Sequence, residues 1–300
     1  MDEGLEWDGA PGAAVLRLPD GAVSAGLVML HGASDGRARQ PLFDGLAAAL
    51  APLGIAALGY ERRAVAGGDT PLRVQAADAV GAVRALQARL GRPVGVSGFS
   101  QGAWAAALAA ADDAVGFLVV LGCSGVTPAE QMRFHTDELL RRRGFSDRER
   151  GRNRELRLRL EDHLRQPVLD RSVRDALDAD LRAAAREPWF PVSYLPSAVP
   201  PGSSGWDDMD FDPVPSFGAV RVPVLAIWGE DEECVPREVS RDRWQESGAD
   251  VTLVDLPGCG HWPVVGSSHP DYAGQEEDAL APSFTASVAT WLGRWLSTAG

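Results

Sequence analysis

The stretch RPVGVSGFSQG, residues 92–102, places Ser100 between two glycines directly after a short apolar run. The run is rich in valine, as expected for a buried strand, and QGAWAAALAAAD (101–112) continues with a helical composition. A strand that enters a helix through Gly-x-Ser-x-Gly holds its serine in a strained turn, with the hydroxyl projecting above the sheet. The stretch therefore predicts a strand–turn–helix unit. Ser100 is either a candidate nucleophile or part of an ordinary tight turn.

Strand-like and helix-like segments alternate on both sides of this stretch. Apolar runs predict buried strands at residues 26–32, 55–60, 93–100, 114–123, 222–229 and 251–258. Helical patterns occupy residues 41–54, 70–91, 101–112, 236–246 and 281–298. Thr70 is the expected N-cap of the second helix. This alternation predicts an α/β fold with parallel strands and helices on both faces of the sheet.

The alternation stops at Ser124 and resumes near residue 221. Between these points the chain is highly charged, and three further helices are expected at residues 128–144, 147–166 and 170–187. The segment after them is rich in proline, glycine and aspartate and predicts no regular element. We therefore expect one core made of residues 1–123 and 221–300, interrupted by a helical insertion at residues 124–220.

Composition narrows the classes of partner. The 300 residues carry a net charge of −13, which argues against binding to nucleic acid or to an anionic membrane surface. No apolar run is long enough to span a bilayer, and the N-terminal residues do not resemble a signal peptide. Three widely spaced cysteines predict no disulfide framework and suit a reducing compartment, so a cytoplasmic location is expected.

A nucleophilic serine needs a base, usually histidine, and a carboxylate that orients the base. GCGHWP (258–263) places His261 on a glycine-rich loop just after the last predicted strand. WGEDEECVP (228–236) ends the preceding strand with three adjacent candidates, Glu230, Asp231 and Glu232. The resulting chain order of serine, acid and histidine is the one expected for a serine in this kind of turn.

A further loop supplies candidates for binding a developing negative charge. LHGAS (30–34) ends the first clear strand, where a backbone N–H can point at the carbonyl oxygen under attack. We therefore predict an oxyanion hole made by the N–H groups of Ala33 and Gln101. The alternative is a plain turn that ends the strand.

The combination HGAS…GFSQG…WGEDEECVP…GCGHWP resembles the α/β-hydrolase superfamily from about residue 26 to residue 296. The segment GFSQGAWAAALAA is similar to esterase-like and dienelactone-hydrolase-like members. YERRAV (60–65) resembles a Y-D-x-R-G turn of many members, with Ala64 in the place of the glycine. The resemblance implies the α/β-hydrolase fold, with a mostly parallel sheet and a helical cap at residues 124–220. The early antiparallel strands of the family would be reduced to AAVLRLPD (13–20) and the residues directly after it.

The resemblance also bears on the choice of acid. The family pattern is G-x-x-D-x-x-V-P, and Gly229 with Val235 and Pro236 keeps that spacing here. The acid position then falls on Glu232, which is our first choice, with Asp231 as the second. A glutamate carboxylate can still orient an imidazole.

The chemistry that the resemblance implies is acyl transfer without a metal or a cofactor, and the cysteines and histidines show no metal-site spacing. The partner would be a small-molecule acyl substrate, cleaved as an ester or a thioester. An acyltransferase, cyclase or peptidase with the same triad, and a non-catalytic binding protein on the same fold, remain alternatives. The sequence is compatible with a homodimer and does not determine the oligomeric state.

The aromatic residues of the insertion are candidates for substrate contact. Trp189, Phe190 and Trp206, together with Trp262 beside the proposed base, are predicted to bind the acyl group. The alternative for each of them is a purely structural role, in which the ring packs within the protein.

Overall fold

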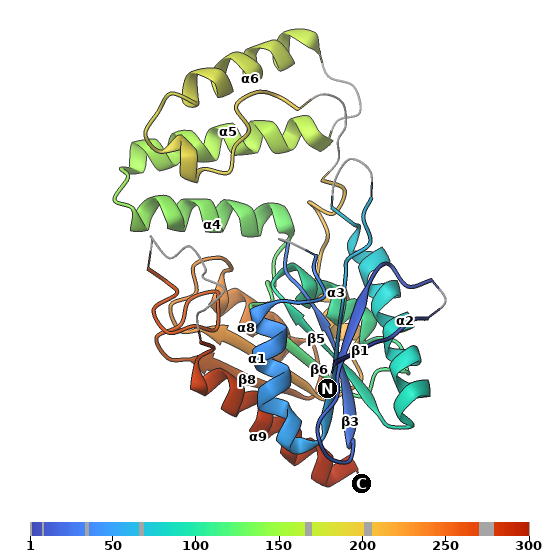
Figure 1. The fold of residues 1–300 in the computed structure, drawn as a ribbon. Coiled ribbons are helices and arrows are strands. Elements are labelled where there is room, and N and C mark those ends of the chain that lie inside the picture. Colours follow the sequence, from blue (N-terminus) through green and yellow to red (C-terminus); the bar gives the residue numbers. More distant parts are fainter. Residues whose placement is uncertain are drawn as a thin grey trace. The chain divides into compact units, whose positions relative to one another are not determined.

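The computed structural model describes residues 2–7, 9–33, 36–65, 69–165, 170–200, 206–269 and 279–299. Their strands form one eight-stranded sheet in the order β1-β2-β4-β3-β5-β6-β7-β8 (Figure 1). The strands are β1 Asp2–Gly4, β2 Ala14–Arg17, β3 Ala25–Leu30, β4 Ile55–Tyr60, β5 Val94–Phe99, β6 Leu118–Leu121, β7 Val224–Gly229 and β8 Val251–Leu256. The pairs β1–β2 and β2–β4 are antiparallel, and all the other pairs are parallel. This is the mixed, mostly parallel sheet that the sequence predicts.

The antiparallel edge differs slightly from the expectation. β2 lies within the predicted stretch AAVLRLPD and pairs with β4, with Leu16 opposite Leu58. An additional strand, Asp2–Gly4, pairs with β2 and is not predicted from the sequence. Its sequence, DEG, contains only residues that are depleted in strands, so it carries no local strand signal.

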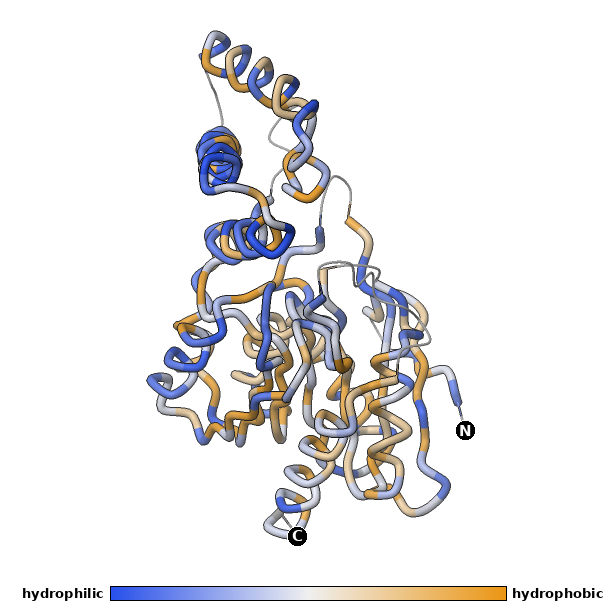
Figure 2. Tube along the Cα trace, turned by 90° about the vertical axis from the view of Figure 1, so that its left-hand side faces the viewer, coloured by the Kyte–Doolittle hydropathy of each residue, from blue (hydrophilic) through white to orange (hydrophobic). Residues whose placement is uncertain are grey.

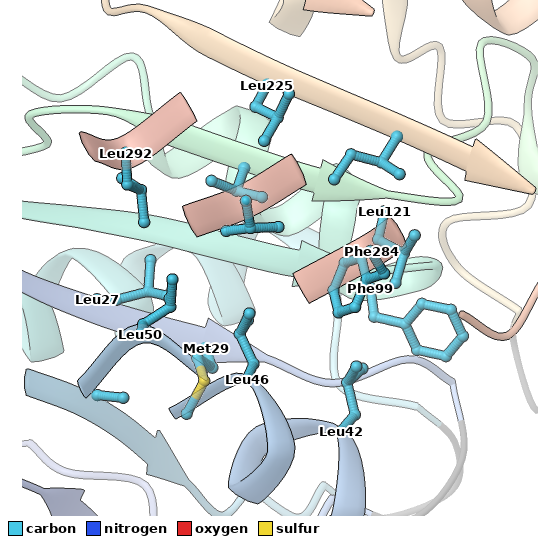
Figure 3. Close-up of a cluster of buried hydrophobic side chains, with 14 of the residues drawn as sticks. Leu27, Met29, Leu42, Leu46, Leu50, Phe99, Leu121, Leu225, Phe284 and Leu292 are labelled. Carbon is cyan, nitrogen blue, oxygen red and sulfur yellow. The ribbon is translucent and has the colours of Figure 1, made fainter. Parts of the chain in front are cut away.

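The central strands are buried on both faces, as their continuous apolar runs predict. On one face, Leu27 and Met29 of β3 pack with side chains from helices α1 (Pro41–Leu50) and α9 (Pro282–Ala299) (Figure 3). On the other face, Gly26 of β3 lies directly against Leu86 of helix α2 (Leu72–Leu90). Alternate residues of one strand therefore face different helices, as the two-residue period of a strand requires.

The described part of the core contains three further helices, and the second of them lies in the segment for which the sequence predicts no regular element. They are α3 Gln101–Ala109, α7 Val214–Ala219 and α8 Arg237–Glu246, and the short 3₁₀ helix η1 spans Ala51–Leu53. Helix α2 ends as predicted, at Gly91 with φ 62°, a left-handed conformation that glycine adopts without a steric cost. Its N-cap is Pro71 and not Thr70, because the Pro71 carbonyl accepts the first hydrogen bonds of the helix, from the N–H groups of Val74 and Gln75.

The insertion forms its own helical unit. It contains α4 Pro128–Arg142, α5 Asp147–Arg165, α6 Arg171–Ala184 and the 3₁₀ helix η2 Phe190–Val192. Thr127 begins α4 with a capping box, in which its hydroxyl accepts from the Glu130 N–H and the Glu130 carboxylate accepts from the Thr127 N–H. Inward-facing apolar residues of the three helices form a separate small core that includes Leu140, Leu156, Leu160, Leu177 and Leu181.

The chain divides into two compact units, and the insertion unit contains Thr127–Phe211. The sequence predicts a longer insertion, at residues 124–220. Ser124–Val126 and Asp212–Val220 instead belong to the core unit, where α7 packs against α3 and α8. Among the described residues, no helix combines the length and the apolar character needed to cross a membrane.

Candidate active site

Ser100 occupies a strained turn between β5 and α3. Its backbone has φ 54° and ψ −119°, a region that residues other than glycine rarely adopt. The turn is held on both sides, because the Ser100 N–H donates to the Leu121 carbonyl at 2.9 Å and the Ser100 carbonyl accepts from the Ala103 N–H at 2.9 Å. Such strain costs about 1–3 kcal/mol and persists where the surrounding structure enforces it, often at functional sites.

The two glycines that flank Ser100 are required by close packing. A Cβ on Gly98 would collide with the backbone of Gly102. A Cβ on Gly102 would lie 2.5 Å from the His31 carbonyl oxygen and 2.7 Å from that of Leu30. The beginning of α3 therefore lies directly against the end of β3, which leads into the predicted oxyanion loop.

His261 is buried on the loop after β8, and its side chain is paired with Glu232. Nδ1 of the imidazole lies 2.9 Å from Glu232 Oε1. A carboxylate oxygen can only accept, so Nδ1 carries the proton and Nε2 is left with a lone pair that can take a proton. Glu232 Oε1 also accepts from the N–H groups of Cys234 at 2.9 Å and Val235 at 3.2 Å, which fix the carboxylate in place.

The structure thus brings the Glu232 carboxylate to the imidazole, and the backbone of the two preceding acids holds the loop in place. The Asp231 N–H donates to the Cys259 carbonyl, and the Glu230 N–H donates to the Leu256 carbonyl, so the backbone at both positions joins the loop to the end of β8. The spacing from Gly229 to Val235 and Pro236 points to the same residue, Glu232.

The negative charges around His261 oppose the effect of burial on its pKa. Burial alone would lower the pKa of His261, but the charge of Glu232, the hydrogen bond to Glu232 and the charge of Glu233 together hold that pKa above its ordinary value. The same carboxylates would stabilise an imidazolium formed when His261 accepts a proton.

His261 lies beside the serine turn. The ring of Phe99, the residue directly before Ser100, has its centroid 5.0 Å from that of the imidazole. The end of β6 supports the imidazole as well, because a Cβ on Gly122 would lie 2.7 Å from His261 Cε1. Side chains from the carboxyl ends of β5, β7 and β8 therefore converge at one edge of the sheet, where ligands bind in open α/β folds.

The loop after β3 reaches this same edge. A Cβ on Gly32 would lie 3.3 Å from Ser100 Cβ, so Ala33 follows a residue in direct contact with the serine turn. Gln101 is the first residue of α3 and follows Ser100 directly, so its N–H lies at the helix N-terminus. Both predicted oxyanion-hole donors thus border the turn at Ser100. Ser34, the last residue of the quoted motif, lies outside the described residues.

Arg62 holds the predicted oxyanion loop and was not singled out from the sequence. Its Nη2 donates to the carbonyls of His31 at 3.1 Å and Gly32 at 2.5 Å, and it lies 3.0 Å from His31 Nδ1. Burial, with a contribution from the Arg62 charge, lowers the pKa of His31 to about 4, so His31 is neutral near pH 7. The family-like turn YERRAV contained this signal, but its alignment placed the arginine at Arg63, which pairs with Asp78 at 2.7 Å.

The loop that carries His261 depends on two more residues that sequence reasoning missed. The Glu233 carboxylate accepts from the His261 backbone N–H at 3.0 Å. The Ser267 hydroxyl accepts from the Gly260 N–H at 2.8 Å and donates to the Trp262 carbonyl at 2.7 Å. Glu233 lies directly after the predicted acid, so its position carried a weak signal, whereas nothing local distinguished Ser267.

The four predicted substrate-binding residues occupy different surroundings. Trp189 is 2% exposed inside the core of the insertion, and Phe190 packs against the same cluster, so packing within the insertion accounts for both rings. Trp262 belongs to the α/β core and has its ring centroid 4.7 Å from that of Phe99. Trp206 is half-buried in the insertion unit. Substrate contact stays a prediction for all four.

A family model described as "Alpha/beta hydrolase family" matches residues 27–273. The chain belongs to the α/β-hydrolase family. The match includes the serine turn, the acid loop and the histidine loop together with the whole insertion. Comparison with curated protein sequences finds no match.

Alignments with solved structures of the same fold extend over nearly the whole chain of this α/β hydrolase. Proline iminopeptidase from Mycobacterium smegmatis is 17% identical with a TM-score of 0.55, and the alignment covers 100% of each chain. A thermophilic esterase from Thermogutta terrifontis is 15% identical with a TM-score of 0.53, covering 99% of each chain. Dienelactone hydrolase from Anabaena variabilis is 15% identical with a TM-score of 0.52, covering 99% of this chain and 96% of that one. At such identities the similarity shows the fold alone.

Proposed function

We propose that this α/β hydrolase cleaves carboxylic esters or thioesters through an acyl-enzyme, with Ser100 as nucleophile, His261 as general base and Glu232 as the orienting carboxylate. The observation that carries the proposal is the 2.9 Å contact between Glu232 Oε1 and His261 Nδ1. It leaves Nε2 as the proton acceptor on an imidazole that lies beside the strained serine turn.

In the proposed reaction, His261 Nε2 takes the hydroxyl proton of Ser100 as Ser100 Oγ attacks the acyl carbon. The N–H groups of Ala33 and Gln101 stabilise the oxyanion. Collapse of this intermediate breaks the bond to the leaving alcohol or thiol, which receives the proton from the imidazolium. A water molecule then attacks the acyl-enzyme, His261 takes a proton from it, and the acid is released with Ser100 restored.

Two of the similar solved proteins support ester cleavage, since one is described as an esterase and another as a dienelactone hydrolase. The proline iminopeptidase keeps a peptidase open as the second candidate. An acyltransferase or a cyclase would use the same three side chains and differ only in the acceptor of the acyl group. A non-catalytic binding protein would leave Ser100 unreactive.

The decisive experiment combines a small fluorophosphonate probe with intact-mass analysis and peptide mapping. We expect a single adduct on Ser100 in the wild type, and none in Ser100→Ala or His261→Ala. Glu232→Gln keeps the shape of the side chain but removes the charge, and it should slow labelling by about 10²–10⁴-fold. Asp231→Asn is the matched control and should label at close to the wild-type rate.

Activity should then be measured on a panel of esters, thioesters, lactones and prolyl amides, with and without added amine and alcohol acceptors. Hydrolysis of an ester or thioester by the wild type, lost in Ser100→Ala, supports the proposal. Acyl products formed on an added acceptor favour a transferase, and prolyl amide cleavage favours a peptidase. An unlabelled wild type whose ligand-induced stabilisation persists in Ser100→Ala would overturn the triad in favour of a binding protein.

A further inference from the structure

Three side chains that commonly bind transition metals lie together where the loop after β7 meets the histidine loop after β8. They are a carboxylate from Glu232, a thiol from Cys234 and an imidazole from His261, and one ligand atom of each lies within 4.8 Å of the others. Thiolate, imidazole and carboxylate are the three ligand types that zinc binds in proteins. No local spacing in the sequence indicates such a site, because Glu232 and Cys234 are separated from His261 by α8 and β8.

The spacing is close to that of a three-ligand zinc site. Zinc binds oxygen and nitrogen at about 2.0–2.2 Å and sulfur at about 2.3 Å, which puts ligand atoms about 3.3–3.8 Å from one another in a tetrahedron. Contraction by about 1 Å from the observed spread is within reach of side-chain rotation at Cys234, which is partly exposed. A fourth position would remain for water.

One oxygen of the Glu232 carboxylate makes no hydrogen bond within the protein. Glu232 Oε1 accepts from His261 and from two backbone N–H groups, whereas Glu232 Oε2 is buried with no hydrogen-bond partner. The side chain is only 1% exposed, so water does not compensate this oxygen freely. A buried carboxylate oxygen without a partner is costly unless a proton or a cation neutralises it.

The surrounding charge also favours a divalent cation. Glu233 adds a second carboxylate, whose Oε1 lies 3.6 Å from Cys234 Sγ. A cation that approaches from solvent would therefore meet the partly exposed Cys234 thiol with the Glu233 carboxylate beside it. Binding of a metal would release the thiol proton to solvent, since the thiolate is the ligand.

We propose that Glu232, Cys234 and His261 bind one Zn²⁺, and that this binding reversibly inhibits the hydrolase. The inhibitory consequence rests on the proposed function, in which His261 is the general base. Zinc on Nε2 would occupy the atom that takes the proton from Ser100. Zinc on Nδ1 would replace the proton shared with Glu232 and disconnect the imidazole from its orienting carboxylate. Either mode stops the reaction, and a chelator restores it.

Metal binding should be measured directly on metal-stripped protein, independently of activity. Titration with Co²⁺ reports a cysteine ligand through a thiolate-to-cobalt charge-transfer band in the near ultraviolet, and Zn²⁺ should displace the cobalt. We expect one equivalent to bind to the wild type, to Ser100→Ala and to Cys259→Ala, which is the matched cysteine control. Cys234→Ser should lack the band and bind Zn²⁺ at least about tenfold more weakly, because even an outer-shell change costs a metal site that much.

Inhibition is then read from the rate of fluorophosphonate labelling with and without Zn²⁺, each variant being compared with its own metal-free rate. Labelling of the wild type and of Cys259→Ala should slow on adding Zn²⁺ and recover with EDTA, while Cys234→Ser should be at least about tenfold less sensitive. If Cys234→Ser binds and responds like the wild type, the site is wrong. A cobalt band in a protein that never labels would keep the metal site and reject the proposed function, whereas labelling without the band would do the reverse.

Discussion

The α/β core and the helical insertion are built by different interactions. In the core, β3, β5 and β7 are buried along their whole lengths, and glycines let backbone segments approach within contact distance. The helices of the insertion contain many hydrophilic residues, which Figure 2 shows in blue. Their surfaces carry many ion pairs, such as Arg159 with Asp180 and Arg165 with Asp210.

The difference predicts where the molecule tolerates change. Every residue of the proposed triad and oxyanion hole lies in the core unit, where shape is fixed by backbone contact. Exposed ion pairs contribute only about 0–1 kcal/mol each, so single exposed charges on the insertion can be replaced at little cost. Mutations that test this contrast should have opposite or very unequal effects in the two units.

The largest effect is expected when glycine is replaced by alanine in a helix of each unit. Gly102→Ala in α3 puts a methyl group against two backbone carbonyls, so we expect a loss of about 3 kcal/mol in the free energy of unfolding, together with loss of Ser100 labelling. Gly151→Ala in α5 meets no heavy atom within 4 Å and should stabilise the protein by about 0.5–1 kcal/mol.

Urea denaturation of the two variants beside the wild type measures both effects. Fluorophosphonate labelling under native conditions separates a misplaced serine turn from simple instability. If Gly102→Ala were as stable and as reactive as the wild type, the close contact between α3 and the end of β3 would not determine the geometry of the site.

The second effect concerns one arginine in each unit. Arg62→Ala removes the donor that ties the carbonyls of His31 and Gly32, so the loop bearing Ala33 should lose its fixed position. We expect kcat to fall by about 10²-fold with a smaller change in KM, since misplacement of a catalytic group by about 1 Å has that cost. Arg165→Ala in the insertion removes an equal charge and should leave kcat near the wild-type value.

Arg62→Lys makes this test specific for positioning. A lysine keeps the charge and can donate to one or two of the carbonyls, so it should restore part of the lost kcat. Equal kcat values for Arg62→Ala and the wild type would show that the loop holds its shape without the arginine.

Most of the fold could be predicted from the sequence because its signals are local. Continuous apolar runs indicated every parallel strand, and helical patterns indicated the three helices of the insertion. Three features were missed for physical reasons. Helix α7, Val214–Ala219, lies in a segment rich in proline and glycine, and its packing against α3 and α8 is not visible in the local sequence. The strand Asp2–Gly4 has no strand propensity of its own and exists only through pairing with β2. The cap of α2 falls on Pro71 and not on Thr70, because the helix begins one residue later and its first hydrogen bonds are accepted by the Pro71 carbonyl.

The candidate site could be predicted only in part, because its members are brought together over long sequence distances. Glycines around Ser100 and the spacing around Glu232 are local patterns, and the structure places Glu232 beside His261 as that spacing requires. The contacts of Arg62 with the loop after β3 and of Glu233 with the His261 backbone join different loops. No spacing within one segment encodes them.

The third effect is a shift in pH dependence that only the core should show. In the proposed reaction the neutral form of His261 is the base, so labelling should rise as the pH increases through the pKa of His261, which the nearby carboxylates hold above its ordinary value. Glu233→Gln keeps an acceptor for the His261 N–H but removes one negative charge. The pKa of His261 should fall, and the acidic limb of the pH profile should move to lower pH.

Glu155→Gln, which removes an exposed carboxylate from the insertion, is the control for a general loss of negative charge. Its profile should overlay that of the wild type. An acidic limb that stays in place or moves to higher pH in Glu233→Gln would mean that Glu233 does not act on the charge of the imidazole.

The smallest effect is expected for an ion pair on the surface of the insertion. Arg171 and Asp175 on α6 are 94% and 70% exposed, with 3.8 Å between Arg171 Nε and Asp175 Oδ2. Their attraction is opposed by the position of Arg171 at the first residue of the helix, where the helix dipole disfavours positive charge. Arg171→Ala should therefore change the free energy of unfolding by no more than about 0.5 kcal/mol in either direction. A loss well above about 1 kcal/mol in urea denaturation would show that surface charges hold the insertion together, and the contrast with the core would no longer stand.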